Sequence, residues 1–279
     1  MFKPKKLLFG TAGIPLSTKQ LSTVAGIERV AELNLEAMEL EFVRSVNVSK
    51  KQALLIKKIS QKNNILLTCH ASYFINLNAV EREKINASKF RILESARRLN
   101  ECGGWSVCFH SGFYLKQDFK KVFSKIETRI KELIKKMNEE SLDVWLRPET
   151  TGKPTQFGTL EELLKISSGF EKVAPVVDFS HLHARTNGKQ NSLDEFKEQL
   201  SLYETHLGNQ GLKNMHIHLS GINYGEKGEK NHLILKESDM NYQDLLSVWK
   251  EFNIKGVVIC ESPNLESDAL LLKKIFSSQ

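Results

Sequence analysis

The sequence has little of what would place the chain outside the ordinary globular class. It has only four cysteines, none in a Cys-x-x-Cys pair: Cys69, Cys102, Cys108 and Cys260. This argues against a disulfide framework and suits small buried side chains in a reducing compartment. Six prolines and 16 glycines exclude a collagen-like or linker-dominated chain. The longest apolar runs, such as 256–260, are too short to cross a membrane, and no secretory signal opens the chain. We therefore expect a soluble, cytoplasmic protein without a membrane partner.

The composition is that of a chain with a packed core. Hydrophobic residues make up 41% and charged residues 26%, which excludes intrinsic disorder. The formal net charge of +7 points to an anionic partner, of which nucleic acid is the obvious case. Because many basic proteins bind no nucleic acid, the charge alone decides nothing.

A repeating pattern of one strand and one helix runs along the whole chain. Eight short apolar runs recur about every 30 to 40 residues, and a helical pattern follows each run. The runs cover 7–13, 37–43, 66–72, 106–112, 143–149, 173–181, 214–221 and 256–262. Eight such units predict an α/β fold, a (β/α)₈ TIM barrel that spans 1–279 as a single domain. A doubly wound open sheet competes with this prediction, but no Gly-x-Gly-x-x-Gly motif opens a helix.

The helical pattern of 80–100 illustrates the repeat. It predicts an amphipathic helix that stops at the glycines 103 and 104. The residues predicted on its buried face are Ile85, Phe90, Ile92, Leu93, Ala96 and Leu99.

Polar side chains collect where the predicted strands end. They are His70, His110, Glu149, Asp178, His181, His216, His218 and Glu261, followed by Glu229 and His232 in the loop after strand seven. The carboxyl ends of barrel strands meet at one mouth, where burying so many ionisable groups without compensation would be costly. Divalent cations remove that cost. Imidazole and carboxylate donors together favour zinc, with manganese or iron as alternatives, and their number favours two or three ions.

The spacing of three histidines adds detail. His216 and His218 are two residues apart, so both point to one side of a strand. His183 and His206 lie away from the strand ends, and we expect neither to bind metal.

At these residues the sequence resembles the endonuclease IV family of apurinic/apyrimidinic (AP) endonucleases, within the xylose isomerase-like barrel superfamily. The segments that carry the resemblance occur in the family's order: HASYFINL (70–77), FHSG (109–112), PETTGKPTQFG (148–158), DFSH (178–181), MHIHLSG (215–221), KGEKNH (227–232) and CESP (260–263). The first of these is the most telling, because no general metal-site rationale explains it.

The resemblance implies a trinuclear zinc centre, with manganese possible at one or more positions. Its ligands would be His70, His110, Glu149, Asp178, His181, His232 and Glu261, with either His216 or His218 from strand seven. Glu229 could serve in place of the family's aspartate, although the loop is one residue longer. Glu149 and Glu261 resemble bridging, catalytic carboxylates, and Tyr73 resembles a DNA-contacting aromatic residue.

The implied activity is metal-dependent hydrolysis of the phosphodiester 5′ to an abasic site in duplex DNA, by a monomer that acts in base excision repair. Basic residues near the mouth are candidates for phosphate contact: Arg147, Lys153, Arg185, Lys227 and Lys230. Two rival functions stay open. One is a sugar isomerase or epimerase of the same superfamily, and the other is a DNA-binding homologue without turnover.

Overall fold

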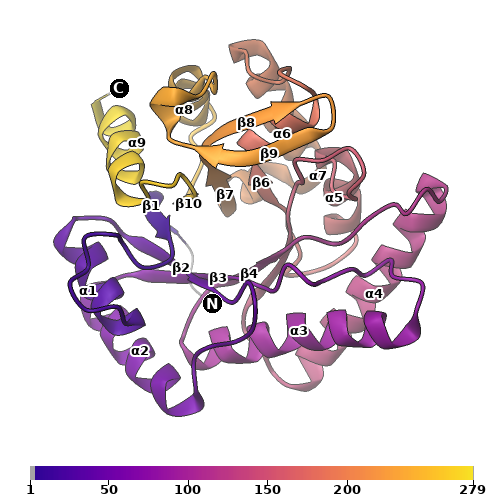
Figure 1. The fold of residues 1–279 in the computed structure, drawn as a ribbon, viewed down its shortest axis with the longest axis horizontal. Helices are drawn as coiled ribbons and strands as arrows, with labels where there is room; N and C mark the ends of the chain where they lie inside the picture. Colours follow the sequence, from indigo (N-terminus) through magenta and orange to yellow (C-terminus); the bar gives the residue numbers. More distant parts are fainter. Residues whose placement is uncertain (1–3, 279) are drawn as a thin grey trace.

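The computed structural model describes residues 4–278, and eight parallel strands form the centre of that part of the chain (Figure 1). Each strand lies within one of the apolar runs that predicted it. They are β1 (Leu7–Ala12), β2 (Ala37–Glu41), β3 (Leu66–His70), β4 (Ser106–Phe109), β5 (Trp145–Pro148), β6 (Val176–Asp178), β7 (Met215–Leu219) and β10 (Gly256–Cys260). Most of their residues are buried on both sides, as strands covered by helices require.

The strands close almost completely into a barrel. Their order is β5-β4-β3-β2-β1-β10-β7-β6, which leaves β5 and β6 as the two edges. Two isolated bridges join these edges, Leu146 to Val173 and Glu149 to Val176. The predicted single-domain (β/α)₈ barrel is therefore confirmed, and the open doubly wound sheet is excluded.

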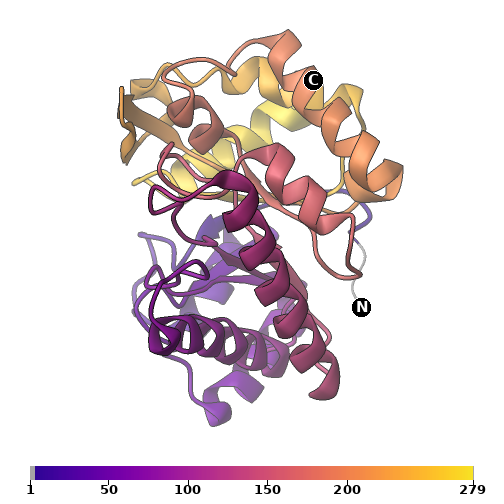
Figure 2. The same cartoon turned by 90° about the vertical axis from the view of Figure 1, so that its right-hand side faces the viewer.

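Helices surround the barrel in chain order (Figure 2). Their bounds are α1 (Thr23–Glu32), α2 (Lys50–Asn63), α3 (Arg82–Glu101), α4 (Phe119–Glu139), α5 (Leu160–Ser167), α6 (Phe179–Arg185), α7 (Leu193–Leu212), α8 (Tyr242–Glu251) and α9 (Glu266–Ser278), with a short 3₁₀ turn, η1 (Leu235–Glu237). Among the described residues, no helix has the length and apolarity that crossing a membrane requires.

Helix α3 matches its predicted range but corrects one residue of the predicted buried face. Ile92, Ala96 and Leu99 are buried against the barrel, whereas Phe90 is 60% exposed. Phe90 lies two residues before Ile92, which is about 200° around a helix, so the two side chains cannot share a face.

The lower end of the barrel interior, remote from the mouth, is filled by an aromatic and aliphatic layer that includes Trp105 and encloses Arg147. The Arg147 guanidinium lies 4.8 Å from the ring centres of both Trp105 and Trp145 and donates to the carbonyl of Asn214 at 2.7 Å. Arg147 is fully buried, so the prediction that it contacts phosphate is wrong. It precedes Glu149 by two residues and points into the barrel one layer deeper.

The stretch after β7 forms an antiparallel hairpin that the sequence suggested only as a loop. Its strands are β8 (Gly221–Gly225) and β9 (Gly228–Leu233), and it packs on α6 (Figure 1). Gly228 has φ +86°, and a Cβ there would lie 2.3 Å from the Gly152 carbonyl oxygen. Glycine at this position lets the hairpin approach the loop after β5, where the Glu229 amide donates to Gly152 at 2.9 Å.

Candidate metal centre

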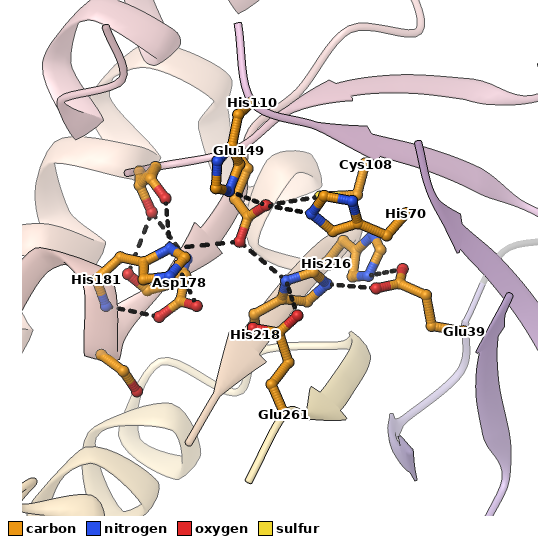
Figure 3. A network of polar contacts seen from close by, with 12 residues as sticks. Glu39, His70, Cys108, His110, Glu149, Asp178, His181, His216, His218 and Glu261 are labelled. Atoms are coloured by element: carbon orange, nitrogen blue, oxygen red, sulfur yellow. Dashed lines mark hydrogen bonds and ion pairs between the residues drawn. The ribbon is translucent and has the colours of Figure 1, made fainter. Parts of the chain in front are cut away.

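The carboxylate of Glu149 is the hub of the polar cluster at the mouth (Figure 3). Glu149 follows β5 and is fully buried. Around its Oε2 lie His70 Nε2 at 3.1 Å, His110 Nε2 at 3.0 Å and Cys108 Sγ at 3.1 Å. Its Oε1 lies 3.0 Å from His218 Nδ1. Donors from β3, β4 and β7 therefore converge on one carboxylate.

A second group of donors comes from the ends of β6, β7 and β10. Asp178 ends β6 and caps helix α6, since its Oδ1 accepts from the His181 amide at 2.7 Å. The cap fixes the first turn of α6 and holds His181 Nδ1 3.3 Å from Asp178 Oδ2. Glu261 Oε1 reaches His218 Nδ1 at 3.4 Å. Ligand atoms of Glu149, Asp178, His218 and Glu261 all lie within 4.8 Å of one another, close enough to share one ion.

The β8–β9 hairpin brings the remaining two predicted ligands to the rim. Glu229 Oε2 lies 3.6 Å from His181 Nε2, and Glu229 Oε1 lies 4.0 Å from His232 Nε2. The side chains of His110 and His232 are 26% exposed and that of Glu261 is 13% exposed. The cluster is thus buried at its base and open to solvent at the mouth.

The pKa shifts within the cluster indicate which of its groups carry protons when no metal is bound. Burial would raise the pKa of Glu149, but the imidazoles, that of His218 foremost, hold it well below its usual range. Burial works against charge on His70, yet its bond to Glu149 raises the pKa of His70 to about 10. For His181 burial is likewise outweighed, by Asp178 and Glu149, and its pKa rises to about 9. Burial raises the pKa of Asp178 to about 6. Without metal, therefore, protons supply the positive charge at neutral pH.

The donor set fits divalent cations. Asp178 Oδ2 is buried, lies 3.3 Å from His181 Nδ1 and makes no hydrogen bond among the described residues, so it is available to a cation. Overlapping groups of three or four donors share Glu149, His181 or Glu261: His70–Cys108–Glu149, His110–Glu149–His181, His181–His232–Glu261 and Glu149–Asp178–His218–Glu261. Shared carboxylates and mixed nitrogen and oxygen donors are typical of sites that hold more than one ion.

The structure separates the two histidines of β7. His218 lies in the cluster, whereas His216 lies one layer deeper, with Nδ1 bonded to Ser106 Oγ at 2.8 Å. Burial lowers the pKa of His216 to about 4, so this imidazole is neutral. Of the two alternatives for strand seven, only His218 faces the other predicted ligands. His183 is outside the cluster and pairs with Asp239, and His206 is on α7.

Two residues of this region were missed by the sequence reasoning. Glu39 lies on β2 within contact of both His216 and His218, and Cys108 contacts Glu149. Both residues have a sequence feature that could have identified them. Glu39 is a charge inside an apolar run, and Cys108 precedes His110 by two residues, so the two side chains point to the same side of β4.

Apart from the buried Arg147, the candidate DNA-contacting residues lie at or near the mouth, and one of them, Arg185, supports a loop. Tyr73 is 52% exposed and packs on Phe74 with ring centres 4.4 Å apart. Lys227 and Lys230 are exposed on the hairpin, and Lys153 is half-buried in the loop after β5. Arg185 instead donates to the carbonyls of Lys153 at 2.6 Å and Gln156 at 2.9 Å, so it holds that loop in place.

Comparison with known proteins places this geometry in a family. Residues 27–275 match the family described as xylose isomerase-like TIM barrel. The uncharacterized protein MJ0133 of Methanocaldococcus jannaschii is 44% identical over 272 residues, which cover 97% of each chain. Endonuclease IV from Thermus thermophilus has a similar structure, with a TM-score of 0.74 and 16% identity over 96% of this chain and 98% of that one. A D-tagatose 3-epimerase-like protein has a TM-score of 0.70 and 17% identity over 96% of each chain. At such identities, these two structures show the fold alone.

Proposed function

This chain belongs to the xylose isomerase-like TIM barrel family, and we propose that it is a metal-dependent AP endonuclease that hydrolyses the phosphodiester 5′ to abasic sites in duplex DNA. The observation that carries the proposal is the size of the cluster. Four donors, Glu149, Asp178, His218 and Glu261, already suffice for one ion. His70, His110, His181 and His232 add imidazoles around the same carboxylates, which supports a centre of up to three zinc ions, with manganese as a substitute.

Bound ions of this kind supply Lewis acidity toward a phosphate and lower the pKa of a water molecule, the two requirements of phosphodiester hydrolysis. The chain's own residues do the positioning. Glu149 is fully buried and surrounded by donors, so it cannot swing toward solvent. Glu261 is at the open side, and in this proposal it orients a reacting water.

The rim supports a polyanionic substrate. Lys227 and Lys230 on the exposed hairpin can neutralise phosphates on either side of the reacting one. The exposed rings of Tyr73 and Phe74 offer a face on which a base pair next to the lesion can stack. An abasic nucleotide leaves the helix at low cost because no base pair holds it, which suits a cluster lying below the rim.

The test is a nicking assay with the zinc-loaded protein on a duplex that contains one abasic site. We expect one cut immediately 5′ to the lesion, leaving a 3′-hydroxyl, with no cut in the undamaged duplex of the same sequence. A chelator should abolish the cut, and added zinc or manganese should restore it. A fully loaded protein that binds but never cuts this duplex would contradict the proposal.

A second candidate is a sugar isomerase or epimerase. One observation favours it: the group Glu149–Asp178–His218–Glu261 forms by itself a compact one-ion site of three carboxylates and one imidazole. Several structures with the same fold are epimerases by name. Interconversion of a ketose or aldose by the loaded protein, together with inactivity on abasic DNA, would select this function.

A further inference from the structure

Below the metal centre, the carboxylate of Glu39 is enclosed inside the barrel. Its side chain is fully buried on β2 and lies between two histidines of β7 (Figure 3). Glu39 Oε1 is 2.9 Å from His218 Nε2, and Glu39 Oε2 is 3.4 Å from His216 Nε2. A carboxylate buried inside a barrel is energetically costly unless it is paired with other polar groups or hydrogen-bonded.

His218 is the residue through which Glu39 meets the metal centre. The two nitrogens of its ring face opposite ways. Nδ1 faces Glu149 at 3.0 Å and Glu261 at 3.4 Å, whereas Nε2 faces Glu39. An imidazole that binds metal through one nitrogen carries its proton on the other, and the partner of that proton fixes both the tautomer and the orientation of the ring.

Glu39 is itself held in place from below. The Thr68 hydroxyl donates to Glu39 Oε2 at 2.7 Å, and Ser106 bonds the far side of the His216 ring at 2.8 Å. The contacts of Glu39 itself therefore come from β3 and β7, and β4 supports it through His216. Among the described residues, the histidines within ion-pair distance of Glu39 are His216 and His218, and its charge also acts on Glu41 and His70.

We propose that Glu39 is a positioning residue of the metal centre: its Oε1, which lies 2.9 Å from His218 Nε2 without being aligned for a hydrogen bond in this structure, accepts the Nε2 proton once His218 binds metal, and so keeps the Nδ1 lone pair directed at the ion held with Glu149 and Glu261. Donor atoms of Glu39, His216 and His218 also lie within 4.8 Å of one another, but in this proposal Glu39 binds no ion. It acts through His218, and neutral His216 closes the other side of its carboxylate. The inference rests on the proposed metal centre, but not on the identity of the substrate.

A double-mutant cycle on zinc affinity tests this inference. The affinity of the full-length protein for zinc is measured by competition with a chromophoric chelator, for the wild type, Glu39→Gln, His218→Asn and the double variant. We expect Glu39→Gln to weaken zinc binding by about 10- to 100-fold. In the His218→Asn background the same substitution should have no further effect, since the residue through which Glu39 acts is gone.

The outcomes separate this inference from the proposed function. Zinc affinity within threefold of the wild type in Glu39→Gln, or an undiminished effect of Glu39→Gln in the His218→Asn background, would overturn the positioning role. Unchanged zinc affinity in His218→Asn would instead overturn the metal centre itself. Circular dichroism melts of each variant show whether it is folded.

A measurement on the wild type covers the case in which a variant does not fold. In ¹⁵N-labelled, zinc-loaded protein, the ring of His218 should carry its proton on Nε2, and its Nδ1 should have the ¹⁵N shift of a metal-bound nitrogen. A proton on Nδ1 in the loaded protein would contradict the inference.

Discussion

The two ends of the barrel interior both bury charge, but they neutralise it differently. At the lower end, the Arg147 guanidinium lies between two indole rings and donates to the carbonyls of Pro175 and Asn214. Burial lowers the pKa of Arg147 to about 10, which still leaves it charged at neutral pH. Backbone carbonyls and ring faces thus accommodate this charge within the protein.

At the mouth, the protein leaves the neutralisation incomplete. Carboxylates lie beside carboxylates, and without metal the protons on His70 and His181 supply the balancing charge. Within the described part of the chain, both ends keep buried polar atoms without a hydrogen bond, such as Arg147 Nε below and Asp178 Oδ2 at the mouth, but the mouth also gathers overlapping groups of imidazole and carboxylate donors that a cation can share. The mouth should therefore respond to metal, and the lower end should not.

The largest expected effect comes from the mouth. Glu261→Gln keeps the shape of the side chain but removes its charge and one acceptor, so the reacting water is less well oriented. We expect cleavage of abasic DNA to fall about a thousandfold, or about 4 kcal/mol, while binding stays within about tenfold. Single-turnover cleavage and equilibrium binding on the same duplex measure the two effects. Wild-type cleavage by a folded, metal-loaded variant would remove Glu261 from the mechanism.

A substitution at the lower end should affect stability and spare the metal. Arg147→Ala removes a large buried side chain that two tryptophans enclose, and we expect the free energy of unfolding to fall by about 3 kcal/mol. Urea unfolding with and without zinc should show the same loss, and the metal content should be unchanged. If the variant instead lost metal at unchanged stability, the two ends would not be independent.

The fold could be predicted from the sequence because the βα repeat and the alternation within each strand are local properties. The depth at which a side chain lies in the barrel, by contrast, depends on how distant strands are arranged. Cys108 pairs in register with both His70 and Arg147, yet His70 faces the cluster and Arg147 lies below it, because the strands tilt as they go round the barrel. His216 and His218 differ in depth because they lie two residues apart along one strand, about 6.6 Å. The sequence analysis described 221–233 only as a loop. The reason for Gly228 at the hairpin turn is its close approach to Gly152, a contact between distant residues that the sequence does not show.

The pH dependence should differ between metal-free and metal-loaded protein. The pKa values of His70 and His181, about 10 and about 9, exceed their unfolded value of about 6.5, so the folded metal-free state holds extra protons between these limits. Their stabilising contribution is complete below pH 6.5 and is lost as the pH rises toward 10. In this range the free energy of unfolding falls by about 1.4 kcal/mol per pH unit for each extra proton that the folded state holds. Unfolding at a series of pH values should show this fall without zinc and a weaker one with it.

The smallest effects are expected at the rim. Replacing Lys227 or Lys230 by serine removes an exposed charge, so affinity for abasic duplex should fall by only a few-fold. The slope of log affinity against log salt should flatten by about 0.9 for each phosphate that the variant no longer neutralises. Lys136→Ser on α4, an exposed lysine away from the mouth, is the matched control and should leave the slope unchanged. Equal slopes for all three variants would place the DNA elsewhere.

The most direct test of the metal centre is the number of ions in the purified protein. Elemental analysis of protein never exposed to chelator should return two to three zinc-like ions per chain, because the donors at the mouth form overlapping groups around shared carboxylates. His110→Asn with His232→Asn should lower that number while leaving the group Glu149–Asp178–His218–Glu261 able to hold one ion. A reproducible value near zero in the wild type would contradict the account.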